Sequence, residues 1–410
     1  MENLLFLLPQ LWLGWTEKTA YIYMKSLKND FNVFVASIFH WGERFHDFSR
    51  IWNDILIAEW NYQKIKDFII RNKIDIIYMH WVSWHKNSSE LINLLKWTKE
   101  KNIRIIETSP FSLFTPDTEN FLDYKLFVSN TSLLKFLWKF KKPNITKYDY
   151  LYNPLDTELL EWYRINDKEK QKEREKIWIK KSDFVIWKVW RADLWKRDDT
   201  IIDIVPLLVK NIPNLKVIIR ALPKYKLKRI KRLGIEKYFV LLPESVDEKE
   251  IANTYQIMDV MLHTSRIWES FWIALAEWMF YKLPVLTIDT DWTQRTAFDR
   301  DNSQWEILWE HNKKFVNNNL HYLTNKIVEL YKDDELRKSI WGKNYEYVQN
   351  HYAVDILREK LLKIINDNYK SDFNYEKKFL IYKSRTIKQK FFKRFFTSIK
   401  AIYEAFLNKY

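Results

Sequence analysis

The sequence contains no cysteine and only 4 glycines among its 410 residues. The absence of cysteine excludes a disulfide-stabilised scaffold, thiolate chemistry, and zinc or iron–sulfur sites with cysteine ligands. Glycine makes up about 1% of the chain, where about 7% is usual for a globular protein. Because glycine normally serves at tight turns and close contacts between backbone and ligand, this scarcity is abnormal.

The chain also lacks a recognisable segment for crossing a membrane or for secretion. Residues Met1–Pro9 are mostly apolar, but they carry neither the basic leader nor the small-residue cleavage site of a signal peptide. The run is also far shorter than the about 20 apolar residues that span a bilayer. We therefore expect a buried first strand at this position and a cytoplasmic protein.

What the sequence does contain is typical of a folded protein. Apolar residues make up 47% and charged residues 30%, which excludes wholesale disorder and low-complexity classes. A length of 410 residues exceeds what one hydrophobic core usually serves, so we expect two domains. The net charge of +15, from 68 basic and 53 acidic residues, suggests an anionic partner.

Short apolar runs alternate with longer amphipathic stretches in the first part of the chain. This alternation predicts a parallel sheet that is covered by helices on both faces. The expected strands are Leu4–Leu8, Phe31–Ser37, Ile74–Tyr78, Ile103–Ile106 and Lys125–Val128, and the expected helices are Glu17–Lys28, Tyr62–Asn72 and Ser88–Lys101.

The same pattern restarts after Asn153–Asp156 and the densely charged stretch Asp167–Lys181. The mixed Lys and Glu residues of that stretch favour a solvated helix over a flexible linker. Two successive α/β sheets bind ligands at the carboxyl ends of their strands, so we expect the site in a cleft between the domains. The expected strands are Phe184–Val189, Leu215–Arg220, Phe239–Leu242, Val260–His263 and Val285–Ile288, and the expected helices are Asp199–Lys210, Glu248–Gln256, Phe271–Tyr281 and Asn319–Tyr331.

The strongest chemical signal lies between His263 and Met279. A strand ends there, a polar loop follows, and a helix is expected from about Phe271, whose unpaired N–H groups suit a phosphate. Glu269 precedes this helix, and Glu277 follows eight residues later. At about 100° per residue, both carboxylates can border one cleft and accept hydrogen bonds from sugar hydroxyls.

A second segment offers two cations. Arg191 and Lys196 follow the expected strand Phe184–Val189, so both can lie at the mouth of the same cleft. A diphosphate suits such a pair, because the cations offset charge that water no longer screens.

These motifs resemble those of GT-B glycosyltransferases, most closely the retaining family 4, also called group 1 glycosyltransferases. Glu269 and Glu277, with Phe271 after the first glutamate and Pro284 after the helix, resemble the family's C-terminal signature.

Three further motifs occur in the family's order. Arg191 with Lys196 is similar to its diphosphate-binding pair, Gly14–Lys18 resembles its N-terminal Gly-Gly loop, and Asn153–Asp156 resembles its interdomain turn. The resemblance covers roughly residues 1–365.

The resemblance implies an α/β protein of the GT-B fold, with two Rossmann-like domains facing across a cleft and a basic C-terminal helical tail. We expect an N-terminal acceptor domain over residues 1–160 and a nucleotide-sugar-binding domain over 161–350. A helix over 351–370 would cross back to the N-terminal domain, and a basic aromatic tail would follow over 371–410.

The resemblance also implies roles for individual residues. Arg191 and Lys196 would bind the donor diphosphate and stabilise the departing nucleotide, while Glu269 would face the transferred sugar. These three are the expected catalytic residues, and Glu277 would hold the ribose hydroxyls. Further donor-binding positions would be Gly14, Trp15, Phe271, Trp272 and Ile273. Such enzymes generally need no metal or other cofactor, because the cations and the helix dipole take its place.

His80 follows the expected strand Ile74–Tyr78 and resembles a histidine that the family often places on the acceptor side of the sugar. A structural histidine, satisfied by the backbone at a strand end, is an equally compatible interpretation. We expect His85 and His263 to be structural.

The sequence departs from the family at its glycines, where tryptophan stands at Trp15, Trp187, Trp190, Trp195, Trp268, Trp272 and Trp278. Indoles at these positions would fill the donor site. Either this chain has lost its site, or UGA codons that the source reads as glycine have been translated as tryptophan. The 4 glycines and 21 tryptophans together make up about 6%, an ordinary glycine content. This total and the retained charged motif residues favour mistranslation.

The C-terminal tail, Ser371–Tyr410, carries 10 basic and 3 acidic residues together with eleven aromatics. Such a composition suits a helical extension packed on the enzyme, a peripheral contact with an anionic membrane, or single-stranded nucleic acid. We expect no nucleic-acid partner, because no nucleic-acid-binding signature accompanies the tail.

The sequence therefore predicts a hexosyltransferase-like enzyme. It would move a sugar from a nucleotide-sugar donor to a glycan or lipid-linked acceptor, with retention of configuration, in polysaccharide biosynthesis. The alternatives are another GT-B enzyme, such as a sugar phosphorylase or epimerase, and an inactive GT-B scaffold that binds glycan or membrane.

Overall fold

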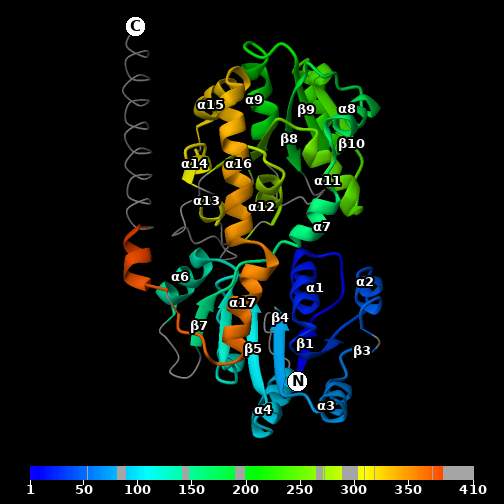
Figure 1. Ribbon diagram of the computed structural model, residues 1–410, viewed down its shortest axis with the longest axis vertical. Coiled ribbons are helices and arrows are strands. Elements are labelled where there is room, and N and C mark those ends of the chain that lie inside the picture. Colours follow the sequence, from blue (N-terminus) through cyan, green and yellow to red (C-terminus); the bar gives the residue numbers. More distant parts are fainter. Residues whose placement is uncertain are drawn as a thin grey trace.

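The computed structural model describes the chain in two stacked α/β domains (Figure 1). The described residues are 1–52, 54–80, 89–140, 147–189, 199–264, 271, 273–288, 303–308, 310–317, 319–371 and 373–381.

Seven parallel strands form the N-terminal sheet, in the order β3-β2-β1-β4-β5-β6-β7. In the inner strand β1, Leu4, Phe6 and Leu8 belong to one core cluster, whereas Leu5 and Leu7 belong to another. Both faces are therefore covered, which explains the continuous apolar run. The strands are β1 (Asn3–Leu8), β2 (Asn32–Ser37), β3 (Ile55–Ile57), β4 (Ile76–His80), β5 (Arg104–Ser109), β6 (Tyr124–Phe127) and β7 (Lys147–Tyr150). The helices are α1 (Trp15–Leu27), α2 (Phe45–Ser49), α3 (Tyr62–Arg71), α4 (Ser89–Glu100), α5 (Pro116–Glu119) and α6 (Asn130–Lys139).

Five parallel strands form the C-terminal sheet, in the order β10-β9-β8-β11-β12. They are β8 (Phe184–Val189), β9 (Leu215–Arg220), β10 (Phe239–Leu242), β11 (Val260–His263) and β12 (Val285–Thr287). The helices that follow the interdomain turn are α7 (Thr157–Trp162), α8 (Asp167–Lys176), α9 (Thr200–Leu208), α10 (Lys224–Arg232), α11 (Glu248–Gln256), α12 (Ile273–Phe280), α13 (Gln304–Ile307), α14 (Glu310–Lys313), α15 (Leu320–Lys332) and α16 (Asp334–His351). The expectation of two parallel α/β sheets is confirmed.

Two segments cross between the domains, and they pair with each other where they cross. The backbone N–H of Leu155 donates to Tyr352 O at 2.7 Å, and that of Val354 donates to Leu155 O at 3.0 Å. Leu155 also forms an isolated parallel bridge with Ala353. The two connecting segments are therefore hydrogen-bonded to each other where they cross.

After this crossing, helix α17 (Val354–Ile365) returns to the N-terminal domain (Figure 1). Leu357, Leu361 and Ile364 are buried in the same cluster as Tyr23 and Met24 of α1. The last helix before the tail thus completes the core of the first domain.

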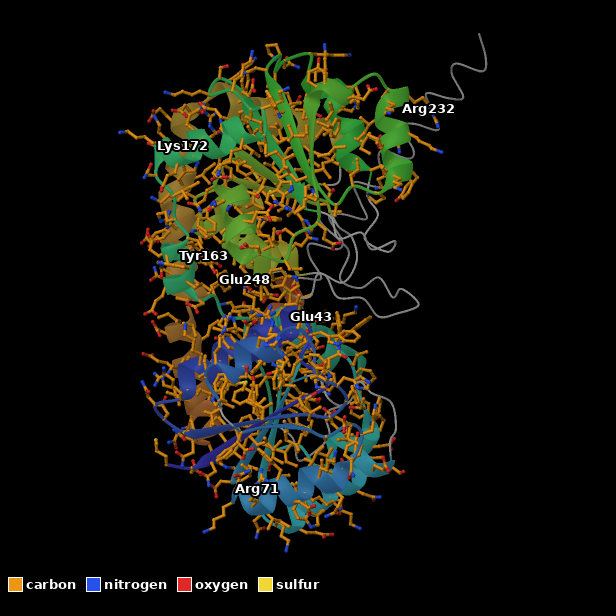
Figure 2. All side chains as sticks on the ribbon, turned by 90° about the vertical axis from the view of Figure 1, so that its right-hand side faces the viewer. Glu43, Arg71, Tyr163, Lys172, Arg232 and Glu248 are labelled. Atoms are coloured by element: carbon orange, nitrogen blue, oxygen red, sulfur yellow. The ribbon has the colours of Figure 1, made fainter. Side chains whose placement is uncertain are left out.

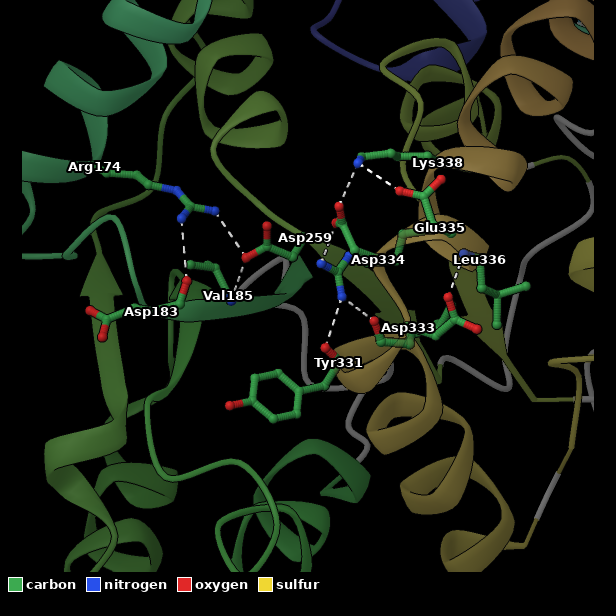
Figure 3. A network of polar contacts seen from close by, with 12 residues as sticks. Arg174, Asp183, Val185, Asp259, Tyr331, Asp333, Asp334, Glu335, Leu336 and Lys338 are labelled. Atoms are coloured by element: carbon green, nitrogen blue, oxygen red, sulfur yellow. Dashed lines mark hydrogen bonds and ion pairs between the residues drawn. The ribbon is translucent and has the colours of Figure 1, made fainter.

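The charged stretch that separates the two sheets begins as a helix, α8. A capping box joins Asn166 and Glu169 at its start. The buried Arg174 donates to Ile257 O at 2.8 Å. It also pairs with Asp259 at 2.9 Å (Figure 3). This residue fixes an otherwise solvated helix to the C-terminal sheet.

Trp178 ends α8 in a conformation that normally requires glycine. Its φ is 63°, and its side chain is exposed. The N–H of Trp178 donates to Glu175 O, and that of Ile179 donates to Arg174 O, which is the Schellman pattern. Trp60 has a similar φ of 65°. Tryptophan at positive φ is a conformational outlier, whereas glycine would adopt it without strain.

Within the part of the chain that the structure describes, no helix combines the length and the apolar character needed to span a membrane.

Candidate functional site

The candidate site is centred on Glu277, in the second turn of α12. This helix follows β11 and begins at Ile273, two residues later than expected. All residues of α12 are buried, because the helix packs against β12 and α16. Glu277 is only 4% exposed, so a carboxylate lies in a largely apolar helix next to the N-terminal domain. A buried carboxylate of this kind needs charged or hydrogen-bonding partners.

Those partners come from both domains. Lys18 Nζ, on α1, lies 3.4 Å from Glu277 Oε1 and 3.3 Å from Glu248 Oε1. Arg44 Nη2 lies 3.7 Å from the same Glu248 oxygen. Figure 2 shows Glu248 where the two domains meet. Two cations of the N-terminal domain therefore face two carboxylates of the C-terminal domain, and we call these four residues the ionic cluster.

Burial and charge act in opposite directions on this cluster. Burial raises the pKa of Glu277, and the charge of Glu248 adds to this, while Lys18 and a hydrogen bond with Tyr255 oppose it. Burial alone would lower the pKa of Lys18, but the charges of Glu277 and Glu248 outweigh it, so that this pKa is raised. The charge of each group thus favours the charged form of the other, although burial leaves the pKa of Glu277 raised.

Gly14 and Trp15 lie beside this cluster at the start of α1. Gly14 is the N-cap residue, and a Cβ at this position would overlap the Glu17 carboxylate. Trp15 is partly buried against the core of the C-terminal domain, and Lys18 Nζ lies 5.2 Å from the centre of its ring. The loop that resembles the family's Gly-Gly loop therefore touches the opposite domain, and its donor-binding role stays a prediction.

Phe271 precedes α12, and Ile273 is the first residue of this helix. The ring of Phe271 is 5.4 Å from those of Tyr152 and Tyr352, and its carbonyl accepts a 3.5 Å hydrogen bond from Asn153 Nδ2. Ile273 is buried. The start of the candidate site helix is thus packed against the crossing segments between the domains.

His80 is the last residue of β4 and is 1% exposed. Burial lowers its pKa to about 3, so the imidazole is neutral at physiological pH. Among the described residues, no hydrogen-bond partner reaches its Nδ1. The alternative expectation was a histidine whose side chain is satisfied by the backbone, and the described contacts do not provide such a partner for Nδ1. The acceptor-side role stays a prediction.

Several predicted site residues lie outside the described residues: Arg191, Lys196, Glu269 and Trp272. In the sequence they follow β8 and β11, and these two strands are neighbours in the sheet. Their roles therefore stay predictions.

Two of the unusual tryptophans are completely buried. Trp187 of β8 and Trp278 of α12 belong to the core cluster around Tyr255, with ring centres 5.0 Å and 5.9 Å from it. The indole Nε1 of Trp187 has no hydrogen-bond partner in the described part of the chain. The structure accommodates these indoles in the core but leaves a buried donor unsatisfied, which is unfavourable.

A second contact between the domains, which the sequence analysis missed, centres on Glu306 of α13. Its carboxylate accepts five hydrogen bonds of 2.6–2.8 Å from the N-terminal domain. The donors are the backbone and side chain of Asn130, the backbone and side chain of Thr131, and the Tyr152 hydroxyl. We call this arrangement the Glu306 clasp. A carboxylate at the N-terminus of α6 is favoured by the unpaired N–H groups and the helix dipole.

The ionic cluster was missed for a physical reason. Lys18 follows Gly14 by one helical turn, which is a usable signal, but Glu277 lies 259 residues away. Glu248 and Glu306 lie in segments without a recognisable motif.

Comparison with known protein families gives a match in the C-terminal domain. Residues 169–346 match the family model of glycosyl transferases group 1. This match covers most of the C-terminal domain. The predicted family is confirmed, and the two facing parallel sheets are those of the GT-B fold. No curated protein matches the chain.

Solved glycosyltransferase structures share the architecture at low sequence identity. HepE from Anabaena, in complex with UDP, has a TM-score of 0.72 and 17% identity, covering 90% of this chain and 100% of HepE. A glycosyltransferase from Rickettsia africae has a TM-score of 0.70 and 15% identity, over 90% and 100% of the two chains. Sucrose-phosphate synthase from Thermosynechococcus elongatus has a TM-score of 0.62 and 9% identity, over 90% and 99%. The fold of these structures thus extends over about 90% of this chain.

Proposed function

We propose that this glycosyltransferase transfers a hexose from a nucleotide-sugar donor to a glycan or lipid-linked acceptor, with retention of configuration. The observation that carries the proposal is the buried Glu277 of the group 1 domain, which lies against the N-terminal domain. An ionised carboxylate accepts hydrogen bonds only, so it suits the vicinal hydroxyls of a ribose.

The structural neighbours suggest which donor to test first. HepE has been solved with UDP and with UDP-glucose. Uridine diphosphate sugars are therefore the first donors that we propose for this chain.

In the proposed reaction, the bond between the anomeric carbon and the β-phosphate oxygen breaks, and that oxygen keeps the electron pair. The acceptor hydroxyl attacks from the face that the nucleotide leaves and transfers its proton to the departing phosphate. Arg191 and Lys196 would offset the charge that develops on the diphosphate. Glu269 would face the sugar and Glu277 the ribose.

The test is the release of nucleotide from UDP-glucose, UDP-galactose and other common donors. The protein should be produced both as printed and with glycine at the motif tryptophans. We expect release with at least one donor, and NMR of the product should show the anomeric configuration of the donor. Lys196→Ala and Glu277→Ala should each weaken donor use. A folded protein that releases nucleotide from no donor would favour the inactive scaffold.

We further propose that the reaction needs neither a metal nor another cofactor, since two cations and a helix N-terminus would surround the diphosphate. The rate should then be unchanged by EDTA. A loss of activity that Mg²⁺ or Mn²⁺ restores would contradict this part of the proposal.

We also propose that the basic tail, residues 371–410, brings the enzyme to an anionic membrane surface where polysaccharide precursors are assembled. Its first part is fixed to the enzyme, because Phe373, Tyr375 and Phe379 pack against Leu134 of α6. Exchange of Lys393 and Arg394 for glutamate should weaken sedimentation with phosphatidylglycerol vesicles. Unchanged sedimentation of this variant would contradict the proposal.

A further inference from the structure

The ionic cluster contains a lysine that the proposed donor site does not yet use. Lys18 is almost completely enclosed, with 13% of its side chain exposed, and it lies between Glu277 and Glu248. Its two N···O distances of 3.3 and 3.4 Å are longer than those of strong charge-assisted hydrogen bonds, about 2.7–2.9 Å. The ammonium is thus shared between two carboxylates of the other domain.

We propose that Lys18 is a positioning residue of the donor site, which keeps Glu277 ionised and aligned so that its carboxylate can accept the donor's ribose hydroxyls. The inference rests on the proposed function, in which Glu277 binds the ribose. It adds a residue of the N-terminal domain to a site built on the C-terminal domain.

The Glu277 carboxylate has acceptor positions left for the ribose hydroxyls. A carboxylate offers about four acceptor positions on its two oxygens. Lys18 contacts only Oε1 of Glu277, and the Tyr255 hydroxyl makes a further hydrogen bond to this side chain. The remaining positions can take two hydroxyl donors. A neutral carboxyl group would turn one acceptor position into a donor and would lose the stronger hydrogen bonds of the charged form.

Charge balance explains why a lysine is needed here. The described groups that face Glu277 are Lys18 from α1, Glu248 and Tyr255 from α11, and Tyr281, which follows α12. Of these, only Lys18 favours the ionised carboxylate by its charge, whereas Glu248 disfavours it. Without Lys18, Glu277 would take up a proton at a higher pH. Donor binding would then fail at a higher pH as the solution is acidified.

The test compares donor kinetics from pH 5 to pH 8 for the wild type, Lys18→Met and Lys18→Arg. We expect Lys18→Met to raise the donor KM by about tenfold at pH 7 and to move the acidic limb of kcat/KM upward by about one pH unit. The change in kcat should be smaller, because donor binding is the step affected. Lys18→Arg should restore most of the donor affinity. Lys25→Met is the matched control, since Lys25 lies on the same helix and pairs with Asp156 instead.

A second variant shifts the charge balance in the opposite direction. Glu248→Gln removes the carboxylate that opposes ionisation of Glu277, so the acidic limb should move to lower pH. If circular dichroism shows that Lys18→Met does not fold, the pH profile of Glu248→Gln still tests the inference.

The outcomes separate the two levels of the argument. If the wild type neither binds nor uses any nucleotide sugar, the proposed function is wrong. If the wild type is active, but Lys18→Met behaves as Lys25→Met does, Lys18 has no positioning role. If Glu248→Gln and Lys18→Met shift the acidic limb in the same direction, the electrostatic basis of the inference is also wrong.

Discussion

The ionic cluster and the Glu306 clasp, two of the contacts between the domains, are built differently. In the ionic cluster, Lys18 and Arg44 face Glu248 and Glu277 at 3.3–3.7 Å, with two charges of each sign. In the Glu306 clasp, one carboxylate accepts five hydrogen bonds of 2.6–2.8 Å. Short directional hydrogen bonds hold one geometry, whereas longer shared ion pairs can exchange partners. We therefore expect the clasp to fix the relative placement of the domains and the ionic cluster to be the more adjustable contact.

The positions of the two contacts agree with this difference. Tyr152 joins the clasp through its hydroxyl, and its ring lies 5.4 Å from that of Tyr352 at the crossing of the chain. The fixed contact is therefore next to the crossing. The ionic cluster joins α1 to α11 and α12, and it includes Glu277, the residue that we propose to bind the ribose of the sugar donor.

The largest effect is expected from breaking the clasp. Glu306→Ala would leave several buried donors of the N-terminal domain without an acceptor, and each costs about 1–3 kcal/mol. We expect the free energy of unfolding to fall by about 3–4 kcal/mol in urea denaturation. Glu335→Ala, which removes an exposed carboxylate of a surface ion pair, should change it by less than about 0.5 kcal/mol. Equal effects of the two variants would contradict the structural role of the clasp.

Glu277→Ala should show the reverse profile, with a large effect on donor use and a small one on stability. Loss of hydrogen bonds to a charged acceptor is worth about 2–3 kcal/mol, or roughly a 30- to 150-fold lower kcat/KM. Initial rates of nucleotide release would measure it. If this variant lost stability as Glu306→Ala does and kept its kcat/KM, the two contacts would have exchanged roles.

A variant at His80 tests how acid changes the stability of the N-terminal domain, separately from its effect on the ionic cluster. The unfolded chain binds a proton at this residue as the pH falls through about 6.5, whereas the folded protein resists protonation until about pH 3. The folded state therefore loses stability below about pH 6.5, by about 2 kcal/mol between pH 7 and pH 5.

The measurement for this prediction is urea denaturation at pH 7 and at pH 5. His80→Gln should lose about 2 kcal/mol less than the wild type over this interval. An identical pH dependence of the two proteins would show that His80 is not the group concerned.

The smallest effect is expected far from both contacts, at Trp178. Trp178→Gly removes the strain of a bulky residue at a φ of 63° and should raise the free energy of unfolding by about 1 kcal/mol. Trp162→Gly is the control, because Trp162 is the last residue of α7 and lies in ordinary helical conformation; it should destabilise the protein by about 1 kcal/mol. Donor affinity should change in neither variant. UGG codons at Trp178 and at the motif tryptophans would contradict the mistranslation hypothesis.

In the N-terminal sheet, the sequence predicted the inner strands better than the edge strands. Strands such as Leu4–Leu8 are buried on both faces and show it as an unbroken apolar run. The edge strands β3 and β7 escaped notice, because one has three residues and the other reads Lys-Tyr-Asp-Tyr. Helix α10 was missed as well, since its sequence between Lys224 and Arg232 is mostly basic. Short or strongly polar elements gain their stability from neighbours that a local pattern does not contain.

The site was predictable only where its residues are neighbours in sequence. The helix that carries Glu277 follows from the strand, loop and helix order between Val260 and Phe280. The pairing of Lys18 with Glu277 joins two domains, and no spacing along the chain encodes it. The Glu306 clasp depends in the same way on the relative placement of α6 and α13, which is a property of the folded pair of domains.

The return of α17 has a consequence for how the protein is made. Leu357, Leu361 and Ile364 fill the core of the first domain, but the rest of that domain ends near Tyr150. A ribosome adds about 5–20 residues per second, so the nascent N-terminal sheet waits roughly 10–40 s for its last helix. Until then an apolar surface beside α1 is open to water, and molecular chaperones have their best opportunity to bind.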